Sequence, residues 1–192
     1  MMLLREVRVL KKNFLIIGIL LIAFLATACG GKSPTEGAGS NLGVEFDAEE
    51  ERLIITHQLG ETPINKNPER VVVFDFSSLD TLDKLGVEVM AIPKNNLPSY
   101  LKHYDTEKYQ NAGGLMEPDF ESIYGMEPDL IIISGRQGEH YQEFSRIGPT
   151  IFVDIDTNRY LDSFKENVRV LGEIFTKEAE AEEELAQIQA AI

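Results

Sequence analysis

The amino-acid sequence predicts an α/β fold with a mainly parallel sheet and helices on both of its faces. Two patterns predict it. Short runs of apolar and β-branched residues, typical of strands that are buried on both faces, occur at 70–76, 87–92, 130–134 and 150–155. Stretches with helical spacing alternate with them, at 78–86, 118–127 and 139–147. This alternation indicates βαβ units, as in a Rossmann-like lobe.

Local signals predict the elements between these runs. The apolar run at 53–59 is followed by a Gly-Glu-Thr-Pro turn, so a small hairpin is expected before the first buried strand. Ser77 or Ser78 is expected to cap the first helix, because serine hydroxyls accept hydrogen bonds from the first turn. Residues 94–114 have weak periodicity and are interpreted as a loop with a short helix around Tyr100.

Two helices are expected at the end of the chain. Apolar residues recur at helical spacing over 160–175, and 178–192 is rich in Ala and Glu with no helix-ending signal. We therefore predict a folded domain over 51–175, followed by the start of a further helix over 176–192.

The first 28 residues have the composition of a signal peptide. Basic residues precede an uncharged apolar stretch that is shorter than the roughly 20 residues of a spanning helix. Small residues then precede Cys29, as in the bacterial lipobox, so residues 1–28 are interpreted as a lipoprotein signal and Cys29 as the lipidated residue. An ordinary secretory signal or a short anchor, with Cys29 incidental, is the alternative.

Residues 29–50 are predicted to form a flexible tether. They are rich in Gly, Ser, Pro and Glu, and such a composition buries too little apolar area to order itself. Signal, cysteine and tether together predict a protein that is lipid-anchored to the cell membrane on its extracytoplasmic face.

Composition and spacing exclude several function classes. The formal net charge is −14, which argues against nucleic acid as a partner. The chain has one cysteine, and His57, His103 and His140 show no ligand-like spacing, so no metal site is expected. No nucleophile elbow or dinucleotide fingerprint is present, so no catalytic residue and no cofactor is assigned.

Several stretches in order resemble the siderophore-binding class of periplasmic-type solute-binding proteins. The resemblance covers about residues 53–192. The stretches that carry it are RVVVFD at 70–75, SLDTLDKLGV at 78–87, EPDFESI at 117–123, EPDLIIISGR at 127–136 and IGPT at 147–150. The sequence looks most like the lipoproteins that bind ferric catecholate siderophores such as petrobactin.

This resemblance implies a substrate-binding lipoprotein of an ABC importer for iron–siderophore complexes, and not an enzyme. It implies a ferric siderophore as ligand and a two-lobed fold whose second lobe is missing here. Residues 51–175 would then be the N-terminal binding lobe, and 176–192 the start of the helix that joins the two lobes. ABC permease subunits are the implied partners, and the protein is expected to be monomeric. Haem or cobalamin binding by the same fold, or a truncated remnant that binds nothing, are the alternatives. An anchored hydrolase would need a nucleophile and a base in one cleft.

Arg136 is the first candidate for ligand binding. It follows a buried strand directly, at the carboxyl edge of the predicted sheet, where open α/β folds bind ligands. A ferric triscatecholate is an anion, and a guanidinium offers permanent charge with a fixed fork of donors. A surface arginine that pairs with Glu139 or Glu143 is the alternative.

The other candidates follow neighbouring strands or carry a matching motif. Lys94, Asn95 and Ser77 are expected at the same sheet edge as donors to the anion, Phe76 beside them, and Tyr100 as a ring that stacks on a catechol. A solvated loop, core packing of Phe76 and simple packing of Tyr100 are the alternatives. Met116 stands where relatives often have a basic residue, which puts one anion contact in doubt.

Glu121 is expected on a different surface. The resemblance implies that an acidic residue at this motif position pairs with arginines of the importer's membrane subunits. The alternative is a solvated helix residue.

Overall fold

The computed structural model describes residues 42–48 and 52–192, which belong to one compact unit. The predicted signal peptide, Cys29 and the tether as far as residue 41 lie outside the described residues. Within the described part, no helix combines the length and the apolar character that crossing a membrane requires.

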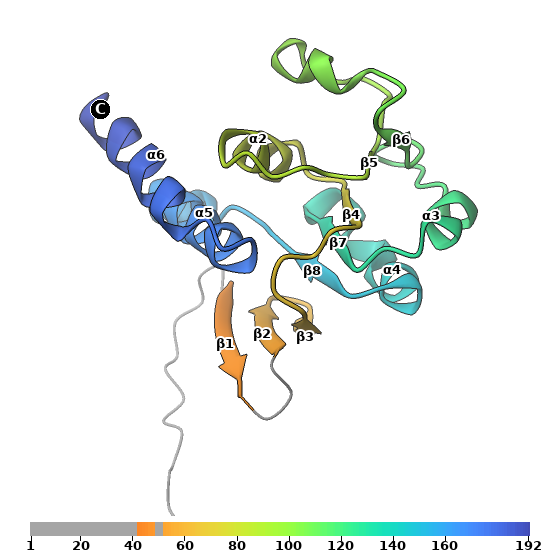
Figure 1. Ribbon diagram of the computed structural model, residues 1–192, viewed down its shortest axis with the longest axis horizontal. Coiled ribbons are helices and arrows are strands. Elements are labelled where there is room, and N and C mark those ends of the chain that lie inside the picture. Colours follow the sequence, from red (N-terminus) through yellow and green to blue (C-terminus); the bar gives the residue numbers. More distant parts are fainter. Residues whose placement is uncertain (1–41, 49–51) are drawn as a thin grey trace, which may run out of the picture. The chain divides into compact units, whose positions relative to one another are not determined.

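A five-stranded parallel sheet forms the centre of the lobe (Figure 1), which confirms the predicted fold class. Its spatial order is β6-β5-β4-β7-β8. The strands are β4 (Val71–Val73), β5 (Ala91–Ile92), β6 (Gln110–Asn111), β7 (Leu130–Ile133) and β8 (Thr150–Phe152). β4, β5, β7 and β8 are shorter than the apolar runs that predict them. The edge strand β6 lies in the predicted loop, and the sequence pattern missed it because it is short and polar.

A second, antiparallel sheet precedes it, in the order β1-β2-β3. Its strands are β1 (Gly43–Asp47), β2 (Arg52–His57) and β3 (Gly60–Ile64). The β2–β3 hairpin was expected. The tether boundary at residue 50 was wrong, because β1 pairs with β2 over its whole length and Val44 packs against the main core.

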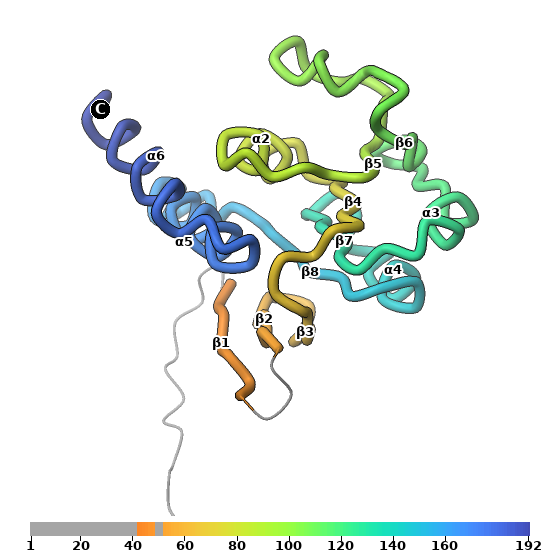
Figure 2. Tube along the Cα trace, in the orientation of Figure 1, coloured from red at the N-terminus to blue at the C-terminus, as the bar shows by residue number. Residues whose placement is uncertain are grey.

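Helices and 3₁₀ turns connect the strands, and Figure 2 follows their path along the chain. They are α2 (Phe76–Lys84), η1 (Ser99–Tyr104), α3 (Phe120–Met126), η2 (Gly135–His140), α4 (Tyr141–Ile147), η3 (Thr157–Arg159), α5 (Tyr160–Ile174) and α6 (Glu178–Ala190). The short helix around Tyr100 is therefore confirmed. The helix predicted from residue 139 begins instead as the 3₁₀ turn η2.

The sheet divides the core into two layers. Alternate strand residues such as Val71 and Val73 pack with α2, η1 and α5, whereas Val72 and Ile131 pack with α3 and α4. This two-sided burial is the reason that the central strands read as continuous apolar runs.

The first helix is capped by Asp75 and not by Ser77 or Ser78. The Asp75 carboxylate accepts hydrogen bonds from the backbone N–H of Ser78 at 2.7 Å and from its hydroxyl at 2.8 Å. Ser78 is thus a donor to the cap. Because Asp75 interrupts the strand two residues after Val73, Phe76 starts the helix and does not end the strand.

Helices α5 and α6 pack closely at Gly172. A Cβ atom on Gly172 would lie 2.9 Å from the Cβ of Ala181 and 3.2 Å from the carbonyl oxygen of Lys177. Ala181 and Leu185 of α6 are buried against Val168 and Leu85. The missing side chain of Gly172 therefore sets the distance between the last two helices.

His57 links the antiparallel sheet to the parallel one. Its Nδ1 accepts a hydrogen bond from the N–H of Leu59, so its Nε2 carries the proton and donates to the Thr62 hydroxyl at 3.0 Å. Thr62 in turn donates to the carbonyl oxygen of Thr150 on β8 at 2.7 Å. Burial lowers the pKa of His57 below its usual value of 6.5, and the side chain is therefore held neutral.

We expect Gly172→Ala to lower the free energy of unfolding by about 1–3 kcal/mol, because the added methyl group overlaps Ala181. Gly125→Ala is the matched control, since Gly125 lies in α3 with nothing within 4 Å of the added Cβ. It should stabilise the protein by up to about 1 kcal/mol. Urea unfolding measures both. Equal effects of the two substitutions would contradict the close contact between α5 and α6.

We expect His57 to make stability fall on acidification. The unfolded chain takes up a proton near the usual pKa of 6.5, whereas the folded protein takes it up only at lower pH. The contribution is therefore complete above the unfolded pKa and is lost as the pH falls from there through the folded pKa. In urea unfolding at about pH 8 and about pH 5, the free energy of unfolding should fall less in His57→Gln than in the unsubstituted protein. An unchanged fall in His57→Gln would refute this role.

Candidate ligand site

A cavity of about 420 Å³ opens at the carboxyl ends of β4, β7 and β8. Each strand contributes the residues that follow it: Asp75, Ser77 and Ser78 after β4, Ser134, Gly135 and Arg136 after β7, and Asp154 and Ile155 after β8. Helix α5 closes the cavity with Phe164 and Asn167. The cavity thus consists of residues that are far apart in the sequence.

The strand order explains why a cavity forms at this place. The chain leaves β4 toward β5 on one side, and later returns to place β7 on the other side of β4. At such a switch point the connections run in opposite directions from adjacent strands, which leaves a crevice outside their carboxyl ends. Ligands of open α/β folds bind in this crevice.

Arg136 lines this cavity, as the sequence predicts. Its side chain is exposed, and among the described residues no ion pair involves it. The alternative of an arginine paired with Glu139 or Glu143 is not realised, because Glu143 instead binds His140 at 2.9 Å. The Arg136 guanidinium is therefore available to an anion.

Gln137, which the sequence analysis did not select, holds the turn that carries Arg136. It is fully buried; its Oε1 accepts a hydrogen bond from the N–H of Ser134, and its Nε2 donates to the carbonyl oxygen of Leu115 at 2.7 Å. A buried glutamine next to a candidate arginine is a signal that the turn is anchored by that glutamine. The partner of Gln137, the carbonyl oxygen of Leu115, lies 22 residues away, so the sequence does not show it.

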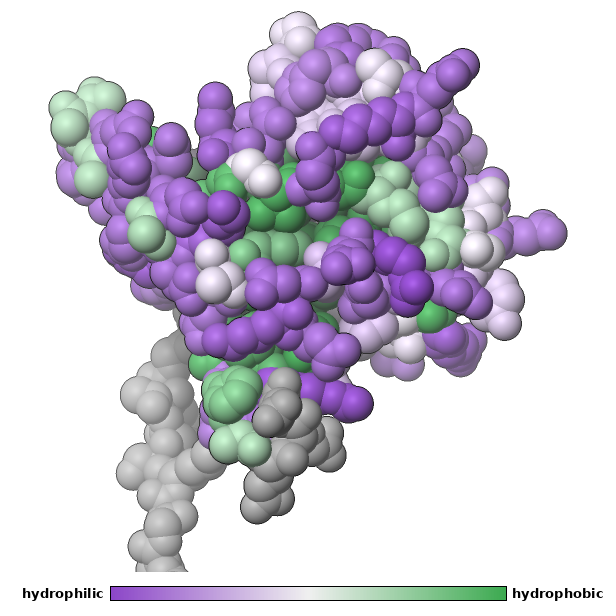
Figure 3. Space-filling model, viewed as in Figure 1, coloured by the Kyte–Doolittle hydropathy of each residue, from purple (hydrophilic) through white to green (hydrophobic). Residues whose placement is uncertain are grey.

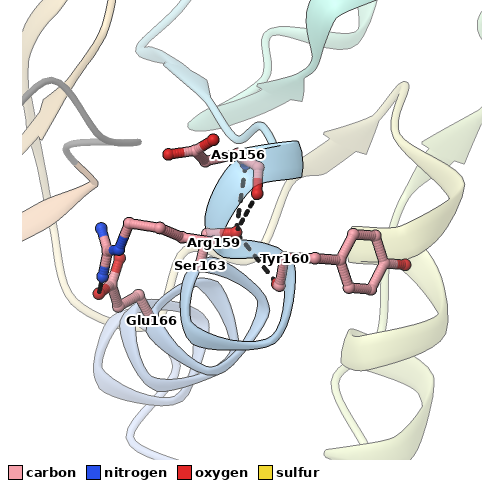
Figure 4. A network of polar contacts seen from close by, with 5 residues as sticks. All are labelled: Asp156, Arg159, Tyr160, Ser163 and Glu166. Carbon is pink, nitrogen blue, oxygen red and sulfur yellow. Dashed lines mark hydrogen bonds and ion pairs between the residues drawn. The ribbon is translucent and has the colours of Figure 1, made fainter.

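The connection from β8 to α5, which forms another wall of the cavity, is held by side chains of α5. Ser163 is fully buried; its hydroxyl accepts a hydrogen bond from the N–H of Asp156 at 3.1 Å and lies 3.1 Å from the carbonyl oxygen of Tyr160 (Figure 4). Asn167 donates from Nδ2 to the carbonyl oxygen of Asp154 at 2.9 Å. The wall is therefore fixed to the helix and is not a free loop.

Asn167 also contributes a buried acceptor without a partner. It is 6% exposed, and its Oδ1 makes no hydrogen bond among the described atoms. The bond to Asp154 fixes the orientation of the amide, because turning it would bring two oxygen atoms together.

The charges around the cavity are mixed. Arg136 is accompanied by the carboxylates of Asp75 and Asp154. Asp75 is engaged by its two bonds from Ser78, and its charge faces the N-terminal turn of α2, which stabilises a negative charge. The remaining carboxylate, Asp154, lies beside the turn of Gly135. An anion is therefore attracted to the Arg136 side of this cavity.

A second groove, of about 320 Å³, adjoins the first. Five residues line both: Ser77, Thr81, Ile155, Phe164 and Val168. Tyr100 lines the second groove and not the first, together with Tyr160 and residues of α6. Ser77 and Tyr100 thus lie in one connected region with Arg136.

The other predicted ligand residues lie away from the two hollows. The ammonium group of Lys94 binds the carbonyl oxygen of Thr106 at 2.6 Å, and Asn95 is exposed beside Gly114. Neither lines the cavity or the groove. Phe76 is partly buried and packs against the core, which is the alternative that its position left open.

Glu121 lies on a different surface, in the first turn of α3, where it is exposed. The helix begins at Asp119, whose carboxylate accepts hydrogen bonds from the N–H and the hydroxyl of Ser122. These bonds lower the pKa of Asp119. Met116 is 67% exposed and lies on the connection before this helix.

The described residues contain no cluster of three or more His, Cys, Asp and Glu side chains that could hold a metal ion. The three histidines have separate partners: His57 binds Thr62, His103 binds Asp83 and His140 binds Glu143.

Comparison with known proteins gives a consistent result. The family model described as "Periplasmic binding protein" matches residues 71–192. The petrobactin-binding protein YclQ of Bacillus subtilis is 46% identical over 187 residues, which are 95% of this chain and 57% of that protein. The ferric-anguibactin-binding protein FatB of Vibrio anguillarum is 34% identical over 145 residues, 73% of this chain and 45% of that protein.

Solved structures agree in fold. The crystal structure of YclQ matches with a TM-score of 0.72 at 49% identity, over 73% of this chain and 50% of that chain. The catecholate-siderophore binding protein VctP of Vibrio cholerae matches with a TM-score of 0.68 at 39% identity, over 73% of this chain and 51% of that chain. These relatives are binding proteins, in agreement with the prediction that the chain is not an enzyme. The chain spans about half the length of the curated relatives it matches.

We expect Ser163→Ala to lower the free energy of unfolding by about 1–2 kcal/mol, because the N–H of Asp156 loses its acceptor. Ser145→Ala is the control, since the exposed Ser145 hydroxyl binds a carbonyl oxygen that water can satisfy. Its effect should stay within about 0.5 kcal/mol. Urea unfolding compares the two, and similar small effects would show that the β8–α5 connection does not depend on Ser163.

Proposed function

The chain belongs to the periplasmic binding protein family, and we propose that it is the ligand-capturing lipoprotein of an ABC importer for iron–siderophore complexes, with a ferric catecholate as ligand. The observation that carries this proposal is Arg136, an unpaired guanidinium in the cavity at the switch point between β4 and β7. The names of the relatives support the ligand class, since they bind petrobactin, ferric anguibactin and a catecholate siderophore.

The charge of the ligand makes Arg136 the decisive residue. A ferric triscatecholate is a polyanion, and the protein has a net charge of −14, so attraction must come from a local cation. A guanidinium that has no protein partner keeps its full hydrogen-bonding capacity for the ligand. The Ser77 hydroxyl lies at the same edge and would donate a further hydrogen bond.

The remaining parts of the proposal concern the membrane and the importer. Cys29 would carry the lipid, residues 1–28 would be removed, and the following residues up to β1 would act as the tether. Glu121, exposed on α3 and outside both hollows, would dock on an arginine of a permease subunit. The helix α6 would begin the element that joins this lobe to a second one.

We expect Arg136→Gln to weaken binding of a ferric catecholate about 10- to 100-fold, because the ligand loses a charge-assisted hydrogen bond. Arg146→Gln is the matched control. It makes the same change of charge on α4, outside both hollows, and should change affinity less than about threefold. Titration followed by the visible spectrum of the ferric complex measures both.

A substitution that removes a negative charge from the cavity tests the electrostatic part of the proposal. Asp154→Asn removes a carboxylate from the cavity, so it should tighten binding of the anionic complex, and added salt should reduce the difference. Binding of haem by the unsubstituted protein without any response to a ferric catecholate would contradict the proposed ligand class. Equal losses in Arg136→Gln and Arg146→Gln would contradict the proposed site.

A further inference from the structure

The joint between α5 and α6 has a backbone conformation that its residue types do not favour. The N–H of Lys177 donates to the carbonyl oxygen of Gly172 at 2.7 Å, and the N–H of Thr176 donates to that of Glu173 at 3.4 Å. These two bonds form a Schellman motif, whose central residue has a left-handed backbone and is usually glycine. Here the central residue is Thr176, with a φ of 53°. A β-branched residue in this region is an outlier, because its side chain crowds the backbone.

The residues around Thr176 are compatible with a helix that does not turn. Phe175 and Lys177 have φ values of −102° and −123°, so within this joint Thr176 is the residue that leaves the right-handed half of backbone space. The sequence has no Gly or Pro over 173–192, and α6 consists mainly of Ala, Glu and Gln, which are strong helix formers. With a right-handed backbone at Thr176, α6 would continue in the direction of α5 instead of folding back along it.

The contacts that hold α6 against α5 are few, and most of them are exposed. Arg169 donates from Nε to one carboxylate oxygen of Glu182 at 2.6 Å and from Nη2 to the other at 3.3 Å, and Lys165 donates to Gln189 at 2.6 Å. Exposed pairs of this kind stabilise only weakly and are screened by salt. Only two residues of α6 are buried, whereas α5 buries seven. Hydrophilic side chains cover most of the part of the molecule where α6 lies (Figure 3). Helix α6 is therefore held less firmly than α5.

We propose that Thr176 is a strained pivot that gives α6 two positions. In the first, α6 folds back on α5, as in Figure 1. In the second, which is a minor state of up to about 10%, α5 and α6 follow one axis. The unfavourable backbone of Thr176 in the first position narrows the free-energy difference between the two.

The position of α6 has a consequence for the groove beside the cavity. Glu184, Leu185 and Ile188 of α6 form one of its walls. The groove is therefore complete only while α6 lies on α5, and the pivot removes or restores this wall. The two positions exist whatever ligand the lobe binds.

Electron paramagnetic resonance can measure the two positions as distances. Spin labels on Asp162→Cys and Gln189→Cys require a Cys29→Ser background, because Cys29 is the one cysteine of the chain. The main distance should be short, since Lys165 lies one turn from Asp162 and bonds Gln189. A minor population should lie near about 40 Å, because each residue between the labels adds about 1.5 Å along a continuous helix.

Three substitutions test the role of the joint. Gly172→Ala should raise the long-distance population, because the added methyl group overlaps Ala181. Thr176→Gly should lower that population about three- to tenfold, alone or combined with Gly172→Ala, and should raise the urea midpoint, because glycine adopts the left-handed backbone without strain. Glu127→Gly is the matched control. Glu127 ends α3 with a φ of 49°, so its replacement should raise the urea midpoint and leave the distances unchanged.

Several results would overturn the pivot. One is a single short distance both in the otherwise unsubstituted labelled chain and in Gly172→Ala. Another is a long-distance population that Thr176→Gly does not lower, and a third is a broad spread of intermediate distances, which would mean that α6 unravels. A long distance that disappears on dilution with unlabelled protein arises between two chains and also overturns it. No ligand is present in these measurements, so their outcome is separate from that of the proposed function.

Discussion

The pairing of β4 with both β5 and β7 is the constraint on which the rest of the structure depends. It places β4, the first strand of the parallel sheet, in the centre of that sheet. The connections that follow β4 and β7 therefore run to opposite sides. The carboxyl ends of β4 and β7 are left without a connection that crosses between them, and a cavity opens there. Two-layer burial stabilises the same strands, since alternate residues of each belong to different core clusters. The hollow is thus a consequence of topology, and its side chains are those that happen to follow each strand.

The buried apolar runs and their alternation with helices were sufficient to predict the fold class, because a strand that is buried on both faces consists almost entirely of apolar residues. Boundaries were less well predicted. Val44 belongs to a strand only because β2 pairs with it, which no local signal near the Gly-rich stretch indicates. The capping role of Asp75 was missed because Ser77 and Ser78 carry the same capping signal, and the carboxylate one turn earlier is the stronger acceptor.

The candidate site was predictable where it depended on strand ends and unpredictable where it depended on distant contacts. Arg136 and Ser77 follow central strands, so the prediction placed them at the sheet edge, and both line the cavity. Lys94 follows β5, further along the same edge, and its ammonium group is used by the carbonyl oxygen of Thr106. Gln137, Ser163 and Asn167 act through partners up to 22 residues away. Only the folded chain shows those partners.

An acidic protein that attracts an anion must concentrate its positive charge, and the geometry around β7 does this with few residues. Turn η2 presents Arg136 while Gln137 buries its own polar atoms against Ser134 and Leu115, so the anchor of the turn does not compete for the guanidinium. The Asp75 carboxylate is occupied at the start of α2, which leaves Asp154 as the main opposing charge. Discrimination between anions then cannot come from charge alone, because a single arginine attracts any of them. The adjoining groove adds both signs of charge, since Lys84 lies there with Asp80 and Glu184, and it adds the exposed rings of Tyr100 and Tyr160. Contacts there would therefore depend on the shape of a ligand as well as on its charge.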